Sequence, residues 1–184
     1  MRVFLTILCL MAVAGSQAMQ PSTALTQPMG LVSSSLLGFG IVIGSTYCHE
    51  LGHQLANTYA LGIKSTIHFT PWPHCRASTF DNSSPAIAVV GAAGPAFGLA
   101  STLVFLKLAN LAYSWGTSDT IINALKTAFQ LPLFAWNKSW IVQGAATIAL
   151  LAHIGSLYPG SIGSKKMDGE DIVTGWYRYK KAKK

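Results

Sequence analysis

Charged residues are what this sequence has least of. Lys, Arg, Asp and Glu together make up 10% of its 184 residues, whereas a soluble domain usually carries about a quarter. Hydrophobic residues make up 51%, and the mean hydropathy is +0.40. This balance argues against an ordinary soluble domain and predicts a membrane protein with one domain's worth of residues.

Cysteine is also scarce, and the positive charge is unevenly placed. The three cysteines contain no CxxC pair, so we expect no structural disulfide. Seven of the thirteen cationic residues follow residue 160, and no basic segment is interleaved with aromatics as in base-stacking surfaces. The sequence therefore predicts no nucleic-acid partner. The basic tail, residues 173–184, is interpreted as a cytoplasmic flank near anionic lipid, or as a solvated disordered tail.

Three apolar stretches, at residues 31–61, 86–107 and 139–158, are each long enough to cross a bilayer as a helix. We therefore expect an all-α membrane protein with about three core transmembrane helices. Residues 63–80 alternate between apolar and polar side chains around Pro71 and Pro73, which predicts a short β-hairpin or an extended loop. Residues 114–138 are mixed in character and indicate an external loop.

The N-terminal segment, residues 1–18, has a signal-like pattern. Arg2 precedes an apolar run, and small residues follow at a candidate cleavage site. An uncleaved signal anchor is the other interpretation. After a polar linker, we expect the core to end near residue 172, so that residues 19–172 form one unit before the basic tail.

The tail also predicts an orientation. Positive residues favour the cytoplasmic side, so the chain after residue 160 should stay there. The span 139–158 then runs inward, as does the span 31–61. This places His49 and His53 near the cytoplasmic face of a multi-pass protein, on the same side as Asp168.

The sequence HELGH at residues 49–53 carries the chemistry. On a helix, His49 and His53 lie one turn apart on the same face, where both rings can bind one zinc ion. Glu50 lies next to the open coordination position and can take a proton from bound water. Between Arg2 and Lys64, Glu50 is the only Asp, Glu, Lys or Arg. Such an isolated carboxylate is costly in an apolar segment unless it is paired or bound.

A catalytic zinc site needs a third protein ligand. Asp168 is favoured because it follows the last span on the predicted side and precedes Gly169, which permits a close approach. The other candidates, with hydrogen bonding or packing as their simpler roles, are Glu170, Asp171, His68, His74 and His153.

Together these motifs resemble the site-2 protease family of intramembrane zinc metalloproteases. The sequence GAAGPAFG at residues 91–98 is similar to the family's Gly-Pro-containing helix. Ser156 to Pro159, followed by Asp168-Gly169, is similar to its Asn-x-x-Pro…Asp-Gly motif. The three stretches occur in the family's order and cover roughly residues 31–172.

The resemblance implies a three-helix catalytic core with zinc held by His49, His53 and Asp168. It also implies a zinc endopeptidase that hydrolyses a peptide bond in or beside the membrane span of a peptide or protein substrate. Glu50 would be its catalytic base. Three further residues would bind substrate or shape the site: Gly94, Pro95 and Ser156.

Two departures from the family pattern keep other functions open. Ser156 stands where the family has asparagine, and the eight residues between Pro159 and Asp168 exceed the usual gap. The extra residues could form a surface bulge or rebuild the helix end. A catalytically inactive zinc-binding membrane scaffold of the same fold fits these departures. In a third interpretation the chain is a transport or assembly subunit in which HELGH is incidental.

Overall fold

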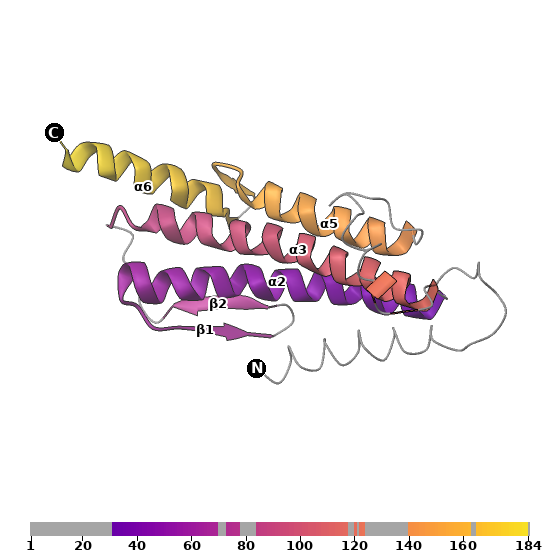
Figure 1. The fold of residues 1–184 in the computed structure, drawn as a ribbon. Helices are drawn as coiled ribbons and strands as arrows, with labels where there is room; N and C mark the ends of the chain where they lie inside the picture. The colour runs from indigo at the N-terminus through magenta and orange to yellow at the C-terminus, as the bar shows by residue number, and fades with distance from the viewer. Residues whose placement is uncertain are drawn as a thin grey trace. The chain divides into compact units, whose positions relative to one another are not determined.

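The structure is a computed structural model, and it describes residues 31–69, 73–77, 84–117, 120, 122–123, 140–162 and 165–183. The predicted signal-like segment, the linker after it and most of the external loop at 114–138 lie outside these residues. Along the chain the described elements are α2 (Leu31–Leu61), β1 (Ser65–His68), β2 (His74–Ala77), α3 (Ile87–Thr117), α5 (Trp140–Ser156), β3 (Ser161–Ile162), β4 (Lys165–Lys166) and α6 (Asp168–Ala182) (Figure 1).

Helices dominate, as the sequence predicts, and the three long apolar stretches form α2, α3 and α5. Helix α3 extends ten residues beyond the predicted end at residue 107, because no proline or glycine interrupts residues 108–115. It therefore includes the beginning of the predicted external loop.

One segment among the described residues is long and apolar enough to cross a membrane by length and composition. This is Ile87–Leu111 in α3, with a mean hydropathy of 1.8. The apolar part of α5, Ile141–Ser156, is shorter, and α2 is interrupted by the polar residues around Glu50. The structure thus gives one candidate span, and the multi-pass arrangement stays a prediction.

A glycine ends α2 and starts the predicted hairpin. Gly62 has a φ of 66°, and the Ile63 amide donates to the Asn57 carbonyl at 3.0 Å. The positive φ is a left-handed backbone conformation that glycine adopts without steric cost, and it ends the helix. The chain then turns back into β1.

The β-hairpin predicted within residues 63–80 is confirmed. Strands β1 and β2 pair antiparallel, from Ser65 opposite Ala77 to His68 opposite His74. The hairpin lies beside the C-terminal half of α2, and the Gln54 side-chain amide donates to the Ser65 carbonyl at 2.8 Å (Figure 1). The helix side chain thus holds the first strand in place.

The longer gap before Asp168 forms a second, very short hairpin. Strands β3 and β4 pair antiparallel, and the Met167 amide donates to the Gly160 carbonyl at 3.2 Å. At Met167 the chain therefore returns to within hydrogen-bond distance of Gly160. This is the bulge that the sequence allowed, and α6 starts immediately after it.

Residues 168–182 form a helix, although the sequence predicted only a basic tail after residue 172. The first turn of α6 holds three acidic residues, and the last turn holds Lys180 and Lys181. Negative charge at the N-terminus and positive charge at the C-terminus both stabilise the helix dipole. This charge arrangement favours helix over a disordered tail.

The described residues divide into two compact units. Those within 1–44 and 102–148 form one, and those within 45–101 and 149–184 form the other. In the first unit, the buried apolar side chains are Leu37, Ile41, Phe105, Leu106, Ala109, Val142 and Ala146. In the second unit they are Ala56, Ile87, Val90 and Ala149, alongside buried polar residues that include His49 and His153.

Small residues set the helix spacing in the second unit. A Cβ atom at Gly52 of α2 would collide with the carbonyl of Ala93 in α3. A Cβ at Gly169 would collide with the Leu157 carbonyl, and one at Gly175 would lie 2.7 Å from the Pro85 carbonyl. These collisions involve main chain, which cannot move aside as a flexible side chain can. The elements around Gly52, Gly169 and Gly175 therefore pack through backbone contact.

We predict that Gly52→Ala lowers the stability of the chain by about 1–3 kcal/mol, because the added methyl must push α2 away from α3. Thermal unfolding of the detergent-solubilised protein, followed by circular dichroism, measures this loss. The matched control is Gly155→Ala, since a Cβ there meets nothing within 4 Å. The control should change stability by no more than about 0.5 kcal/mol. Equal effects of the two variants would contradict the close packing at Gly52.

Candidate metal centre

His49 and His53 present their rings on the same face of α2. The ring centroids are 4.8 Å apart, the ring planes are inclined at 78°, and the two Nε2 atoms lie 3.1 Å from each other. His49 is 9% exposed and lies within the second unit. The helical spacing read from the sequence thus brings two nitrogen donors together at a buried point.

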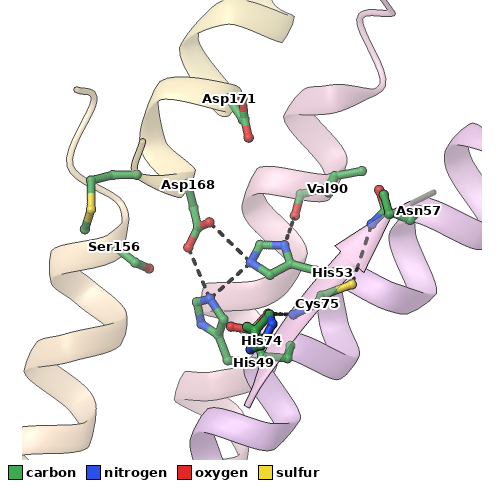
Figure 2. Close-up of a pocket in the computed structure, with 12 residues that line it drawn as sticks. His49, His53, Asn57, His74, Cys75, Val90, Ser156, Asp168 and Asp171 are labelled. Carbon is green, nitrogen blue, oxygen red and sulfur yellow. Dashed lines mark hydrogen bonds and ion pairs between the residues drawn. The ribbon is translucent and has the colours of Figure 1, made fainter. Parts of the chain in front are cut away.

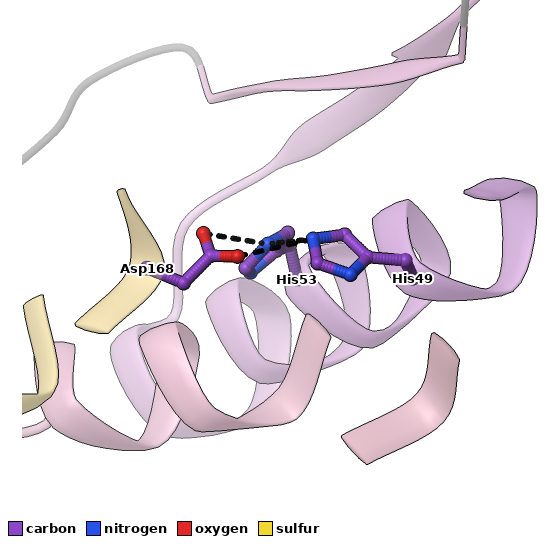
Figure 3. A group of neighbouring side chains, drawn as sticks. All are labelled: His49, His53 and Asp168. Atoms are coloured by element: carbon purple, nitrogen blue, oxygen red, sulfur yellow. Dashed lines mark hydrogen bonds and ion pairs between the residues drawn. The ribbon is translucent and has the colours of Figure 1, made fainter. Parts of the chain in front are cut away.

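Asp168, the first residue of α6, completes the group. Its Oδ2 lies 3.2 Å from His49 Nε2, and its Oδ1 lies 3.2 Å from His53 Nε2. Figure 3 shows the carboxylate and the two rings pointing toward one another. These three side chains offer one ligand atom each, all within 4.8 Å of one another, and so could hold a metal ion.

Hydrogen bonding fixes the orientation of the His53 ring. His53 Nδ1 lies 2.9 Å from the Val90 carbonyl oxygen, which can only accept. One ring proton is therefore on Nδ1, and Nε2 faces the centre, where its lone pair can bind a second proton or a metal ion. A lone pair that faces a second Nε2 and a carboxylate is stabilised by a cation, either a proton or a metal ion.

The centre keeps Asp168 ionised. Burial acts to raise the pKa of its carboxyl group, but the hydrogen bonds and the positive charge that the His49 and His53 rings supply outweigh burial. The pKa therefore lies well below its ordinary value. An anionic oxygen at this position is what a metal ion requires of a carboxylate ligand.

The β-hairpin positions Glu50. The main-chain amide of Cys75 in β2 donates to Glu50 Oε2 at 2.7 Å. Glu50 also lines a cavity of about 320 Å³ that includes the three metal-binding candidates. The remaining described residues that line this cavity are Asn57, His74, Cys75, Ala77, Val90, Ser156, Met167 and Asp171 (Figure 2). The carboxylate is thus held at the same cavity as the ligand group.

The hairpin also affects the thiol that lines the cavity. Burial raises the pKa of the Cys75 thiol, hydrogen bonding to Ser65 and Asn57 partly opposes this, and the negative charge of Glu50 adds to it. At neutral pH the thiol is therefore protonated. Cys75 contributes its main-chain amide to the site, and its sulfur stays uncharged.

Helix α3 leaves room for the rings. A Cβ atom at Gly94 would overlap the His53 ring, and one at Gly91 would lie 2.6 Å from the Asp168 carbonyl oxygen. Pro95 is fully buried within α3. Gly94 thus lies against the His53 ring with no room for a side chain, and the site-shaping role expected of Gly94 and Pro95 stays a prediction.

Ser156 lines the cavity, but its hydroxyl bonds within its own helix. Ser156 Oγ donates to the His153 carbonyl oxygen at 2.8 Å. This is the usual behaviour of a serine near a helix end. The position thus borders the site while its polar atom is engaged locally.

The other candidates for a third ligand lie outside the group that the described residues form. His68 and His74 stack on each other across the hairpin, with ring centroids 5.5 Å apart. His74 and Asp171 line the cavity, while Glu170 does not. His153 is buried and places its Nδ1 3.2 Å from His49 Nδ1, behind the ring rather than at the centre.

Sequence reasoning missed two functional groups, the Val90 carbonyl and the Cys75 amide. Both are main-chain atoms, so residue type gives no signal for them. The alternation of the hairpin predicted strand geometry near Cys75, but only the fold shows that this strand lies beside Glu50.

No protein-family model matches this chain, and neither does any curated protein or any solved structure. The resemblance seen in the sequence therefore depends on its three motifs.

We predict that Asp168→Ala lowers the metal content of the purified protein to well below one ion per chain, because it removes the only anionic donor of the group. Elemental analysis by mass spectrometry measures the stoichiometry. Asp171→Asn is the matched control, since Asp171 lies one turn later on α6 and lines the same cavity. The control should keep the metal of the unaltered chain. If Asp168→Ala also keeps it, the third ligand is another residue.

Proposed function

We propose that this protein is an intramembrane zinc endopeptidase. One observation carries the proposal. His49, His53 and Asp168 converge on one point, and Glu50 is held at the same cavity by the hairpin. Two imidazoles and a carboxylate form the donor set of catalytic zinc sites, which use three protein ligands and leave one position open.

The spacing of the donors supports zinc. Zinc binds nitrogen and carboxylate oxygen at about 2.0–2.2 Å in a tetrahedral arrangement, which places neighbouring donors roughly 3.3–3.6 Å apart. The two Nε2 atoms lie 3.1 Å apart, and each lies 3.2 Å from a different oxygen of Asp168, so that one ligand atom from each residue falls within 4.8 Å of the others. No cysteine belongs to the group that the described residues form, which argues against a closed structural site.

A zinc ion at this point would polarise the substrate carbonyl and lower the pKa of a water molecule toward neutrality. The protein's own part is to manage the proton. The Cys75 amide engages Glu50 Oε2, which orients the carboxylate so that it accepts a proton from the attacking water. Glu50 then delivers this proton to the amine that leaves as the peptide bond breaks.

The surroundings support a substrate within the membrane. Two residues near the start of the candidate span Ile87–Leu111 border the site: the Val90 carbonyl accepts from His53, and Gly91 leaves no room for a Cβ beside the Asp168 carbonyl. The helices of the second unit also expose large apolar side chains, among them Val89, Phe97, Leu151 and Ile154. Such surfaces suit a lipid bilayer. A substrate helix must unwind there before its carbonyl can react, because helical amides are already hydrogen-bonded.

One observation supports a second candidate, the inactive zinc-binding scaffold. The Ser156 hydroxyl donates its hydrogen to a carbonyl of its own helix. It cannot donate the same hydrogen to a substrate, whereas the asparagine at this position in the site-2 protease family could. Both candidates bind zinc, and cleavage separates them.

We predict that Glu50→Gln leaves zinc bound but lowers cleavage of a membrane-embedded test substrate by roughly 10²–10⁴-fold, the usual contribution of a general base. Metal analysis and a gel-based cleavage assay in proteoliposomes measure the two effects on one preparation.

Glu170→Gln is the matched control for that experiment, because Glu170 is a glutamate outside the metal group and the cavity. It should keep both zinc and cleavage. Persistent cleavage by Glu50→Gln would remove Glu50 from the role of base. Zinc without cleavage in the unaltered chain would favour the scaffold.

The proposal places the active site and the C-terminal tail on the cytoplasmic side of a multi-pass protein. In a chain whose three native cysteines are replaced by serine, we predict that Ala182→Cys reacts with an impermeant maleimide only in inside-out vesicles. Asn123→Cys, in the predicted external loop, should react only in right-side-out vesicles. Labelling of both positions from the same side would contradict the proposed orientation.

A further inference from the structure

His153 is a buried polar residue of the second unit that the proposed mechanism does not use. It lies on α5, is 4% exposed, and stacks on the His49 ring with centroids 5.1 Å apart and planes inclined at 19°. Its Nδ1 lies 3.2 Å from His49 Nδ1. We propose that His153 is a positioning residue that holds His49 in the tautomer able to bind the metal ion, an inference that rests on the proposed zinc site.

The contact between the two rings allows one proton. Two ring nitrogens at hydrogen-bond distance need one hydrogen between them, because two hydrogens collide and none leaves lone pairs opposed. Either His49 donates to His153, or His153 donates to His49. The two arrangements differ at the far side of His49.

Only one arrangement is compatible with the metal centre. If His49 donates through Nδ1, its Nε2 presents a lone pair toward Asp168 and His53. If His153 donates instead, a neutral His49 carries its proton on Nε2, which then cannot bind a metal ion. Metal binding therefore requires His153 Nδ1 to accept.

The two metal histidines are thus held by different kinds of partner. The Val90 carbonyl behind His53 can only accept a hydrogen bond, so it always holds a proton on His53 Nδ1. His153 behind His49 can accept or donate. Among the described residues, His153 Nε2 is buried without a hydrogen-bond partner, so the contact to His49 is the polar contact in which its ring takes part. An aspartate at this position would also accept, but it would add a second buried anion beside Asp168 in an apolar helix.

Helix α3 holds the His153 ring in place. A Cβ atom at Gly98 would lie 2.5 Å from His153 Nδ1 and 2.6 Å from Cε1. Gly94, one helical turn earlier, makes the same kind of space for His53. The glycines at 94 and 98 thus accommodate one ring of the centre and one ring behind it.

The test measures metal affinity rather than cleavage. His153→Leu keeps an apolar side chain of similar bulk but leaves the His49 N–H without its acceptor, so we expect zinc to bind roughly 10- to 100-fold more weakly. His153→Asn places an acceptor oxygen at the position of Nδ1 and should restore most of that affinity. Zinc competition against a chromogenic chelator on the full-length protein gives both constants.

Cobalt absorption tests the geometry independently. Cobalt(II) in the unaltered chain should give the intense visible bands of a tetrahedral site, His153→Leu should weaken or shift them, and His153→Asn should recover them. Gly98→Ala would place a methyl group against His153 Nδ1 and displace the ring. It should therefore resemble His153→Leu, and it tests the inference if His153→Leu does not fold. His68→Asn, which alters an exposed histidine outside the cavity, is the control and should change neither affinity nor spectrum.

The outcomes separate the inference from the proposed function. Unchanged affinity and spectrum in His153→Leu would overturn the positioning role while leaving the zinc site intact. Equal weakening in His153→Leu and His153→Asn would assign the effect to ring packing and would also overturn it. Absence of zinc and cobalt binding in the unaltered chain would remove the proposed function together with this inference.

Discussion

The whole site depends on two ring nitrogens and one carboxylate that face one another across a buried point. The Nε2 atoms of His49 and His53, both on α2, lie 3.1 Å apart, and each lies 3.2 Å from a different oxygen of Asp168 at the start of α6. Without a cation between them, lone pairs and negative charge would repel one another. The rest of the second unit supports this convergence. Glycines let the backbones approach closely, the Val90 carbonyl lies behind the His53 ring, and the His153 ring lies behind the His49 ring.

The hairpin of β1 and β2 orients the Glu50 carboxylate. A helix alone would present Glu50 about 100° around its axis from His49, with a carboxylate free to rotate. The Cys75 amide restrains this carboxylate at the cavity. A strand that carries no acidic side chain thus controls the orientation of the acidic group, because a main-chain donor does not depend on residue type.

Periodicity and spacing in the sequence predict the parts of the structure that depend on interactions between residues close together in the chain. HELGH on an apolar helix placed two rings on one face, and alternation at residues 63–80 predicted the hairpin. Asp168 was favoured through the orientation rule and the family resemblance, and the structure brings it to the histidines. Helix α6 was missed because its residues are too polar for an apolar pattern, and its support comes from charges placed at its two ends. The contacts of Val90, Cys75 and His153 join segments distant in sequence, so only the folded chain reveals them.

Because Asp168 opens α6 while both histidines belong to α2, any ion bound here also ties together two helices from distant parts of the chain. Its binding energy then adds to the energy of folding, by about 2.7 kcal/mol at a free metal concentration a hundred times the dissociation constant. A cell short of that metal would hold more of this protein with its last helix loosened and open to proteolysis. Metal supply would in this way regulate how long the protein survives as well as whether it can act.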